Sequence, residues 1–144
     1  MTSAHILLVE DNEGDILLTR EAFEESKISI SLDIARNGKE ALDFLYKRNN
    51  FNDAHTPNLI LLDINLPIFN GLEVLRQIKN DPNLKMIPVI MLTTSTHKRD
   101  IELAYKYHCD SYVEKPIDIK RFLKTILEIE NFWLQLAISS NTNK

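Results

Sequence analysis

The chain has 144 residues, of which 44% are hydrophobic and 26% are charged, and its formal net charge is −4. This size and composition are typical of one globular domain with a full hydrophobic core. The acidic balance disfavours a nucleic-acid surface, and the longest apolar runs fall well short of the roughly 20 residues that a membrane span requires. Cys109 is the single cysteine, which excludes an internal disulfide and favours a reducing, cytoplasmic setting.

Short apolar segments alternate along the chain with segments of helical periodicity. In chain order we expect a strand at 5–10, a helix from 16, a strand at 30–36, a helix at 38–48, a strand at 59–63, a helix at 71–80, a strand at 87–93, a helix at 98–108, a strand at 111–115 and a long helix from about 118 to 138. Five strand–helix units in succession predict an α/β fold, a parallel sheet with helices on both faces. A helical bundle would leave the five β-rich runs unexplained.

Polar side chains stand where the predicted strands end. Glu10 and Asp11 close the first strand, Asp63 the third, Thr93 the fourth and Lys115 the fifth. Because ligands of parallel sheets bind at the carboxyl ends of the strands, we expect these groups on one rim. Carboxylates about 4 Å apart repel one another by roughly 4 kcal/mol per pair, so a divalent cation is the simplest completion of the site. An all-oxygen ligand set favours Mg²⁺ over zinc.

A magnesium site beside an aspartate, a hydroxyl and a lysine suits phosphoryl transfer, with Asp63 as the covalent acceptor. The run "LILLD" at 59–63 reads as a strand that is buried on both faces and positions this carboxylate. We expect Pro67 to end the strand, so that the following loop can wrap the metal.

These residues resemble the receiver domain of two-component response regulators. The matching features are Glu10–Asp11, "LLDINLP" around Asp63, Gly71, "MLTTS" and "YVEKP", within a region from about 5 to 127. The resemblance implies a flavodoxin-like (βα)5 doubly wound sheet of strand order 2-1-3-4-5. It also implies a phosphorylation-controlled signalling switch rather than an enzyme, in which Asp63 accepts a phosphoryl group from a sensor histidine kinase or a phosphotransfer protein.

The resemblance also implies roles for individual residues. Asp11, Asp63 and the carbonyl of Asn65 would bind Mg²⁺ directly, and Glu10 would act largely through water. Thr93 and Lys115 would hold the phosphoryl oxygens. On phosphorylation Thr93 would move inward and Tyr112 would follow it. The Lys115–Pro116 peptide bond would be cis.

A narrower resemblance indicates the class of kinase that would act as partner. "PNLILLDINLP", "DPNLKMIPVIMLTTS" and "ENFWL" are similar to the small response regulators that partner bacterial phytochromes. A bacterial phytochrome is therefore a candidate kinase. One departure from the family is Thr94, at a position where many receivers carry alanine, which leaves less room beside Tyr112.

The predicted last helix, about 30 Å long, should overhang a strand of roughly 17–20 Å. The overhang carries the apolar residues Phe132, Trp133, Leu134 and Leu136. We expect a homodimer through the face formed by helix 98–108, strand 111–115 and this last helix; the alternative is that the segment folds back on its own domain. The whole chain, 1–144, is then a single receiver domain with a core at about 5–127, a helical extension at about 128–138 and a frayed tail at 139–144.

Three functional hypotheses follow. The first is a signalling switch without an output domain, which acts through protein contact or onward phosphotransfer. The second is an inactive scaffold with the receiver fold, which the full set of site residues disfavours. The third is a phosphohydrolase with an aspartate nucleophile, which would need a second carboxylate where this chain has Asn65.

Overall fold

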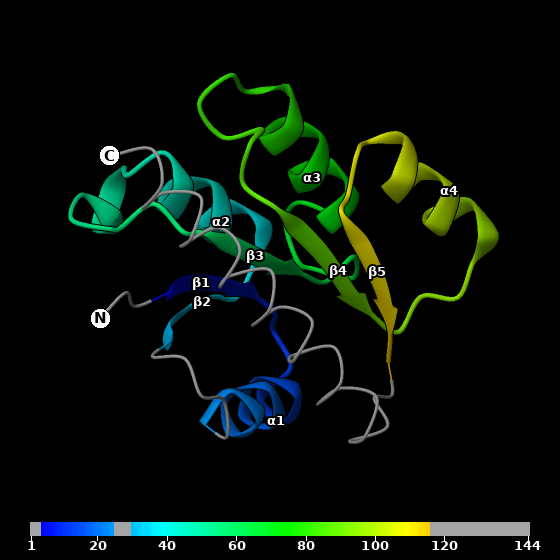
Figure 1. Ribbon diagram of the computed structural model, residues 1–144, viewed down its shortest axis with the longest axis horizontal. Coiled ribbons are helices and arrows are strands. Elements are labelled where there is room, and N and C mark those ends of the chain that lie inside the picture. The colour runs from blue at the N-terminus through cyan, green and yellow to red at the C-terminus, as the bar shows by residue number, and fades with distance from the viewer. Residues whose placement is uncertain (1–3, 25–29, 116–144) are drawn as a thin grey trace, which may run out of the picture.

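The computed structural model describes residues 4–24 and 30–115. Its elements are β1 (Ala4–Val9), α1 (Glu13–Glu24), β2 (Ile30–Ala35), α2 (Gly38–Leu45), the 3-10 helix η1 (Asn49–Phe51), β3 (Leu59–Leu62), α3 (Gly71–Asn80), β4 (Val89–Thr93), α4 (Lys98–Lys106) and β5 (Ser111–Glu114). The five strands form one parallel sheet of order β2-β1-β3-β4-β5, as expected (Figure 1). Among the described residues, no helix has the length and apolar character of a membrane span.

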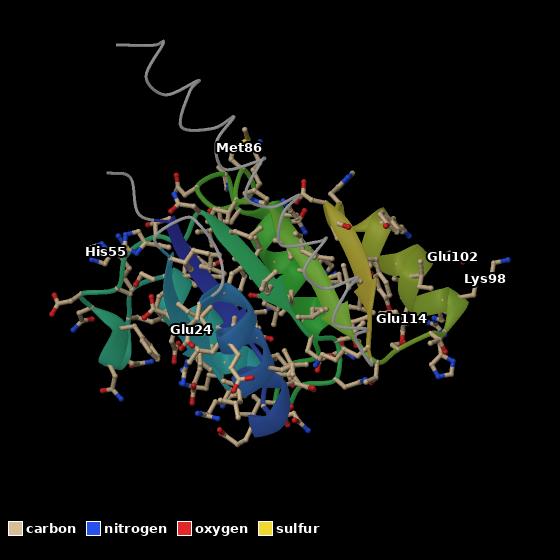
Figure 2. All side chains as sticks on the ribbon, turned by 60° about the horizontal axis from the view of Figure 1, so that its bottom comes forward. Glu24, His55, Met86, Lys98, Glu102 and Glu114 are labelled. Atoms are coloured by element: carbon tan, nitrogen blue, oxygen red, sulfur yellow. The ribbon has the colours of Figure 1, made fainter. Side chains whose placement is uncertain are left out.

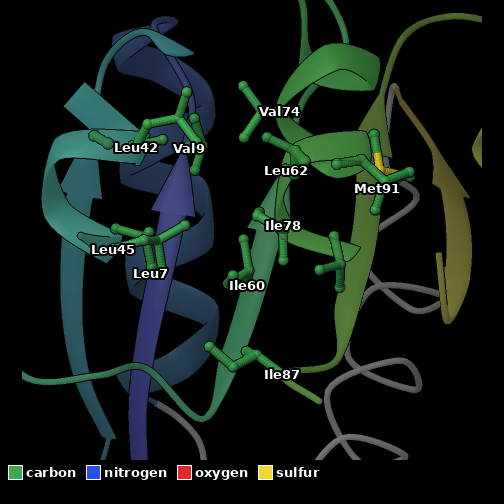
Figure 3. Close-up of a cluster of buried hydrophobic side chains, with 14 of the residues drawn as sticks. Leu7, Val9, Leu42, Leu45, Ile60, Leu62, Val74, Ile78, Ile87 and Met91 are labelled. Atoms are coloured by element: carbon green, nitrogen blue, oxygen red, sulfur yellow. The ribbon is translucent and has the colours of Figure 1, made fainter. Parts of the chain in front are cut away.

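The two faces of the sheet carry separate hydrophobic clusters because side chains alternate along each strand. Leu7 and Val9 of β1 point to the face that α2 and α3 cover, with Ile60 of β3 beside them (Figure 3). Ile6 and Leu8 point to the opposite face, where α1 packs through residues such as Ile16 and Phe23 (Figure 1). All four residues of β3 are buried, which confirms that the run at 59–62 is a strand covered on both faces.

Helix α4 is the least buried of the described α-helices, with Ala104 as its one buried residue. Lys98 and Glu102 lie on its outer side, where their charged atoms are 3.8 Å apart and largely exposed (Figure 2). This charged face is a solvated helix surface.

The structure confirms the five predicted strands and the first four predicted helices, with ends that shift by a few residues. The prediction about Pro67 is wrong. Strand β3 ends at Leu62, well before the proline, because the backbone turns at Asp63 and the amide of Gly71 donates to the Ile64 carbonyl at 2.8 Å.

Several predicted features lie outside the described residues. They are the last helix at about 118–138, the Lys115–Pro116 peptide bond, the tail, and the apolar set Phe132, Trp133, Leu134 and Leu136.

Candidate functional site

Glu10, Asp63 and Lys115 each directly follow the last residue of a strand. Their backbone amides continue the hydrogen bonding between neighbouring strands. The amide of Glu10 donates to the Ala35 carbonyl at 2.9 Å, and the amide of Asp63 donates to the Val9 carbonyl at 3.1 Å. The amide of Lys115 donates to the carbonyl of Thr93 at 2.6 Å. The backbone under each functional side chain is therefore fixed by the neighbouring strand, which is why the polar groups converge on the carboxyl edge of the sheet.

Three carboxylates meet at this edge. Glu10, Asp11 and Asp63 each offer an oxygen, and these oxygens all lie within 4.8 Å of one another. Glu10 and Asp63 are 2% and 6% exposed, whereas Asp11 is open to solvent. Two buried anions at this separation need a cation, and oxygen ligands with one open side fit a hard divalent ion. The residues present thus fit the divalent metal that the sequence predicts.

Lys115 lies against this cluster, as predicted, and is 5% exposed. Its Nζ forms a short ion pair with the Glu10 carboxylate and lies 3.4 Å from Oδ2 of Asp63. Because the lysine bridges the two buried acids, it offsets part of their repulsion while leaving a net negative charge at the rim.

Burial and this ion pair have opposite effects on the pKa of Glu10. Burial raises the pKa of the Glu10 carboxyl to about 7, even though the Lys115 ammonium favours its charged form. Burial by itself would lower the pKa of Lys115, but the hydrogen bonds to Glu10 and Asp15 outweigh it and the pKa lies above its usual value. Lys115 is therefore a permanent cation at neutral pH.

The loop after β3 carries Asn65 beside the aspartate. The Asn65 amide donates to Oδ1 of Asp63 at 3.2 Å, so this loop and the carboxylate are tied together. Gly71, at the start of α3, passes so close that a Cβ at this position would overlap the Asp63 carbonyl. Ile68 adopts φ 70°, a strained conformation for a β-branched residue, and its side chain is 66% exposed.

The β4 end carries the predicted switch residues. Thr93 is fully buried, and its hydroxyl accepts a hydrogen bond from the Ser95 amide at 3.3 Å. Tyr112 is half-buried, and its hydroxyl donates to the Ser95 carbonyl at 2.8 Å. Thr94 is exposed, with its hydroxyl 3.4 Å from Nδ2 of Asn65. The backbone of Ser95 therefore contacts both predicted switch residues, Thr93 through its amide and Tyr112 through its carbonyl.

The sequence analysis missed Asp15 at this site. Its Oδ2 accepts a hydrogen bond from Nζ of Lys115 at 2.9 Å, a shorter contact than that between Lys115 and Asp63. The signal was the position of Asp15 in the first turn of the helix that follows Glu10 and Asp11, which places it above the same strand end.

The parallel five-stranded fold and this acidic edge are those expected of a receiver domain, and comparison with known proteins agrees. The chain matches the family described as response regulator receiver domain over residues 6–127, and it belongs to that family. It is 43% identical over 130 residues to response regulator Rcp1 of Synechocystis, covering 90% of this chain and 88% of Rcp1.

Two solved structures show the same likeness. The Mn²⁺-bound form of Rcp1 superposes with a TM-score of 0.82 at 43% identity, over 91% of this chain and 94% of that one. The phosphorylated cyanobacterial phytochrome response regulator RcpA superposes with a TM-score of 0.84 at 41% identity, over 92% and 95% of the two chains. The resemblance inferred from the sequence, to receivers and to the phytochrome-associated group among them, is confirmed.

Proposed function

We propose that Asp63 is the phosphoacceptor of this receiver domain. The observation that carries this proposal is a buried carboxylate at the end of the central strand β3, within reach of both Lys115 and the acidic pair. In the reaction, a carboxylate oxygen of Asp63 forms a bond to phosphorus while the phosphorus–nitrogen bond of a kinase phosphohistidine breaks. The imidazole leaves with the bonding electron pair and is protonated. The product is an acyl phosphate.

The surrounding residues bind the transferring group. The Lys115 ammonium and the Thr93 hydroxyl donate to phosphoryl oxygens, and Lys115 compensates the added negative charge. Asp11, Asp63 and the carbonyl of Asn65 would hold Mg²⁺ directly, with Glu10 acting largely through water, and the ion would neutralise further charge on the phosphoryl oxygens. Support for a divalent ion comes from the three convergent carboxylates here and from the Mn²⁺ in the Rcp1 structure.

The signal is read on the face that Tyr112 borders. Its hydroxyl donates a hydrogen bond to the Ser95 carbonyl, two residues after Thr93. Movement of Thr93 toward a phosphoryl group would change this backbone unit and so bias the position of the ring between two states. The domain acts by this change of surface, through protein contact or onward phosphotransfer, and it is not an enzyme acting on a separate substrate.

The partner that supplies the phosphoryl group is a sensor histidine kinase or a phosphotransfer protein. A bacterial phytochrome is the candidate kinase, because relatives of this chain include RcpA and two bacteriophytochrome response regulators. We further infer one receiver domain over 1–144 and a homodimer through α4, β5 and the following segment. The Lys115–Pro116 bond is inferred to be cis, as the family resemblance implies.

The test is intact mass after incubation with Mg²⁺ and a small-molecule phosphodonor. Wild type should gain one phosphoryl adduct that requires Mg²⁺, and Asp63→Asn should gain none. A folded wild-type protein without an adduct would support the scaffold hypothesis instead. Turnover of a generic phosphomonoester would support the phosphohydrolase, which Asn65 disfavours because an amide cannot serve as the general acid.

A further inference from the structure

We propose that Asp15 is a positioning residue for Lys115, and that by competing for the lysine ammonium it lowers the affinity of the site for a phosphoryl group. The proposal rests on the proposed role of Asp63 as phosphoacceptor. It assigns to α1 a direct part in tuning the site, through a residue that is neither the acceptor nor a member of the metal-binding group.

The contacts of Lys115 motivate this assignment. An ammonium has three N–H donors, and here they face Glu10, Asp15 and Asp63. The distance from Nζ to Asp15 is 2.9 Å, whereas the distance to Asp63 is 3.4 Å. The lysine is thus held more closely by Glu10 and Asp15 than by the residue whose phosphoryl group it is to bind.

The backbone around Asp15 is well fixed, so its carboxylate is a defined partner. Its amide donates to Oδ1 of Asn12 at 2.9 Å, and its carbonyl accepts a hydrogen bond from the buried hydroxyl of Thr19 at 2.8 Å. Asn12 in turn donates its own amide to the Glu10 carboxylate at 3.0 Å. Asp15 and Glu10 are therefore parts of one connected unit at the start of α1, with Lys115 between them.

The charges of the site give the direction of the effect. Among the described residues, the carboxylates that can share a cation are Glu10, Asp11 and Asp63. Asp15 stands apart from that group and neutralises Lys115 instead. A phosphoryl group needs the positive charge of Lys115, so the Asp15 carboxylate competes with it. Because the Asp15 side chain is 38% exposed, solvent screens the competition and the effect should be moderate.

The experiment measures binding of beryllofluoride, an anion that mimics a phosphoryl group on a carboxylate, at saturating Mg²⁺ by titration calorimetry. The variants are Asp15→Asn and Asp15→Ala, which remove the charge in two different ways, and Asp15→Glu, which keeps it. The matched control is Glu13→Gln, the same loss of charge in the same turn of α1. Glu13 is 74% exposed and pairs with Arg36, away from Lys115.

We expect Asp15→Asn and Asp15→Ala to bind beryllofluoride about fivefold more tightly than wild type. Asp15→Glu and Glu13→Gln should stay within about twofold of wild type, and so should the Mg²⁺ affinity of all four variants. A purely structural role would not separate the anion affinity from the metal affinity in this way.

Three results would overturn the inference: unchanged or weaker beryllofluoride binding in Asp15→Asn and Asp15→Ala, an equal gain in Glu13→Gln, or a parallel change in Mg²⁺ affinity. In each of these cases wild type still binds beryllofluoride, and the proposed function stands. Wild type that binds neither beryllofluoride nor a phosphoryl group, although folded, would instead remove the proposed function.

Discussion

At the scale of single residues, several charged side chains are buried or partly buried, and each of them forms an ion pair or hydrogen bond. Lys115 is paired with three carboxylates at the functional edge. Asp43, in α2, is 4% exposed and accepts hydrogen bonds from Lys39 at 2.8 Å, Arg48 at 2.6 Å and Asn49 at 3.0 Å. The two clusters differ in their balance of charge: the first has more carboxylates than cations, whereas in the second every charged group has a partner.

The Asp43 cluster gives a prediction about stability and pH. The hydrogen bonds from Lys39, Arg48 and Asn49 hold the pKa of the Asp43 carboxyl well below its usual value. A carboxyl with a lowered pKa binds fewer protons in the folded state, so its stabilising contribution is present above the ordinary pKa of about 3.8 and disappears as the pH falls further. Asp43→Asn should therefore lower the Tm at pH 7, and the deficit should shrink progressively below about pH 4.

Thermal unfolding followed by circular dichroism between pH 7 and pH 2.5 measures this deficit. The control is Glu102→Gln, which breaks an exposed pair with Lys98 and should leave the Tm nearly unchanged at every pH. A deficit for Asp43→Asn that stays constant across the range would show that the side-chain amide, and not the loss of charge, is responsible.

At the scale of elements, the helices begin in different ways. The Asn37 side chain accepts a hydrogen bond from the Glu40 amide at 2.8 Å and caps α2, and Asn70 caps α3 through the Leu72 amide at 2.7 Å. The residue before α4, His97, makes no such bond. The α2 and α3 starts are therefore locally specified by sequence, whereas α4 depends on packing against the sheet.

The caps give a matched pair of substitutions. Asn37→Ala should lower the free energy of unfolding by about 1 kcal/mol, because the start of α2, which is partly buried, loses the acceptor for one of its free amides. His97→Ala removes a side chain from the equivalent position of α4 and should change the free energy by less than about 0.5 kcal/mol. Urea unfolding of both variants measures the difference. Equal losses in the two would show that the side-chain bond of Asn37 contributes nothing.

At the scale of the whole molecule, the functional site exists only when the sheet is complete. The ion pair between Lys115 and Glu10 joins residues 105 positions apart in the chain, and the contact between Lys115 and Asp63 joins residues 52 apart. The strands that carry them are bound in the order β1-β3-β4-β5. Any change that loosens an edge strand therefore also changes the electrostatics of the site.

The association of two chains is the prediction at this scale. The sequence places Phe132 and Trp133 beyond the predicted core, and on the described part of the same face Tyr105 of α4 is 51% exposed. We expect Phe132→Ala combined with Trp133→Ala to shift sedimentation toward the monomer, because each apolar side chain of this kind contributes about 1.5–3 kcal/mol when buried. An unchanged sedimentation coefficient would favour a segment that folds back on its own domain.

The sequence by itself determined the five strands, the first four helices and the residues at the strand ends, because each of these rests on a local pattern. The uninterrupted apolar run before Asp63 predicts a strand buried on both faces, and polar residues at the ends of parallel strands necessarily share one edge. The family motifs then specified the strand order and the family, which the fold and the comparisons confirmed.

Only the tertiary structure decided how the charges at that edge are paired. The sequence predicts Lys115 beside Asp63, where it lies, but its ammonium is closer to the Asp15 carboxylate. Asp15 lies on a helix, so the search for polar residues at the ends of strands does not find it. The backbone likewise leaves the strand at Asp63 and not at Pro67, and Gly71 permits this turn because a Cβ there would overlap the Asp63 carbonyl. The first outcome depends on a contact between residues 100 positions apart, and the second on how closely a short loop folds back on itself. Local periodicity carries no information about either distance.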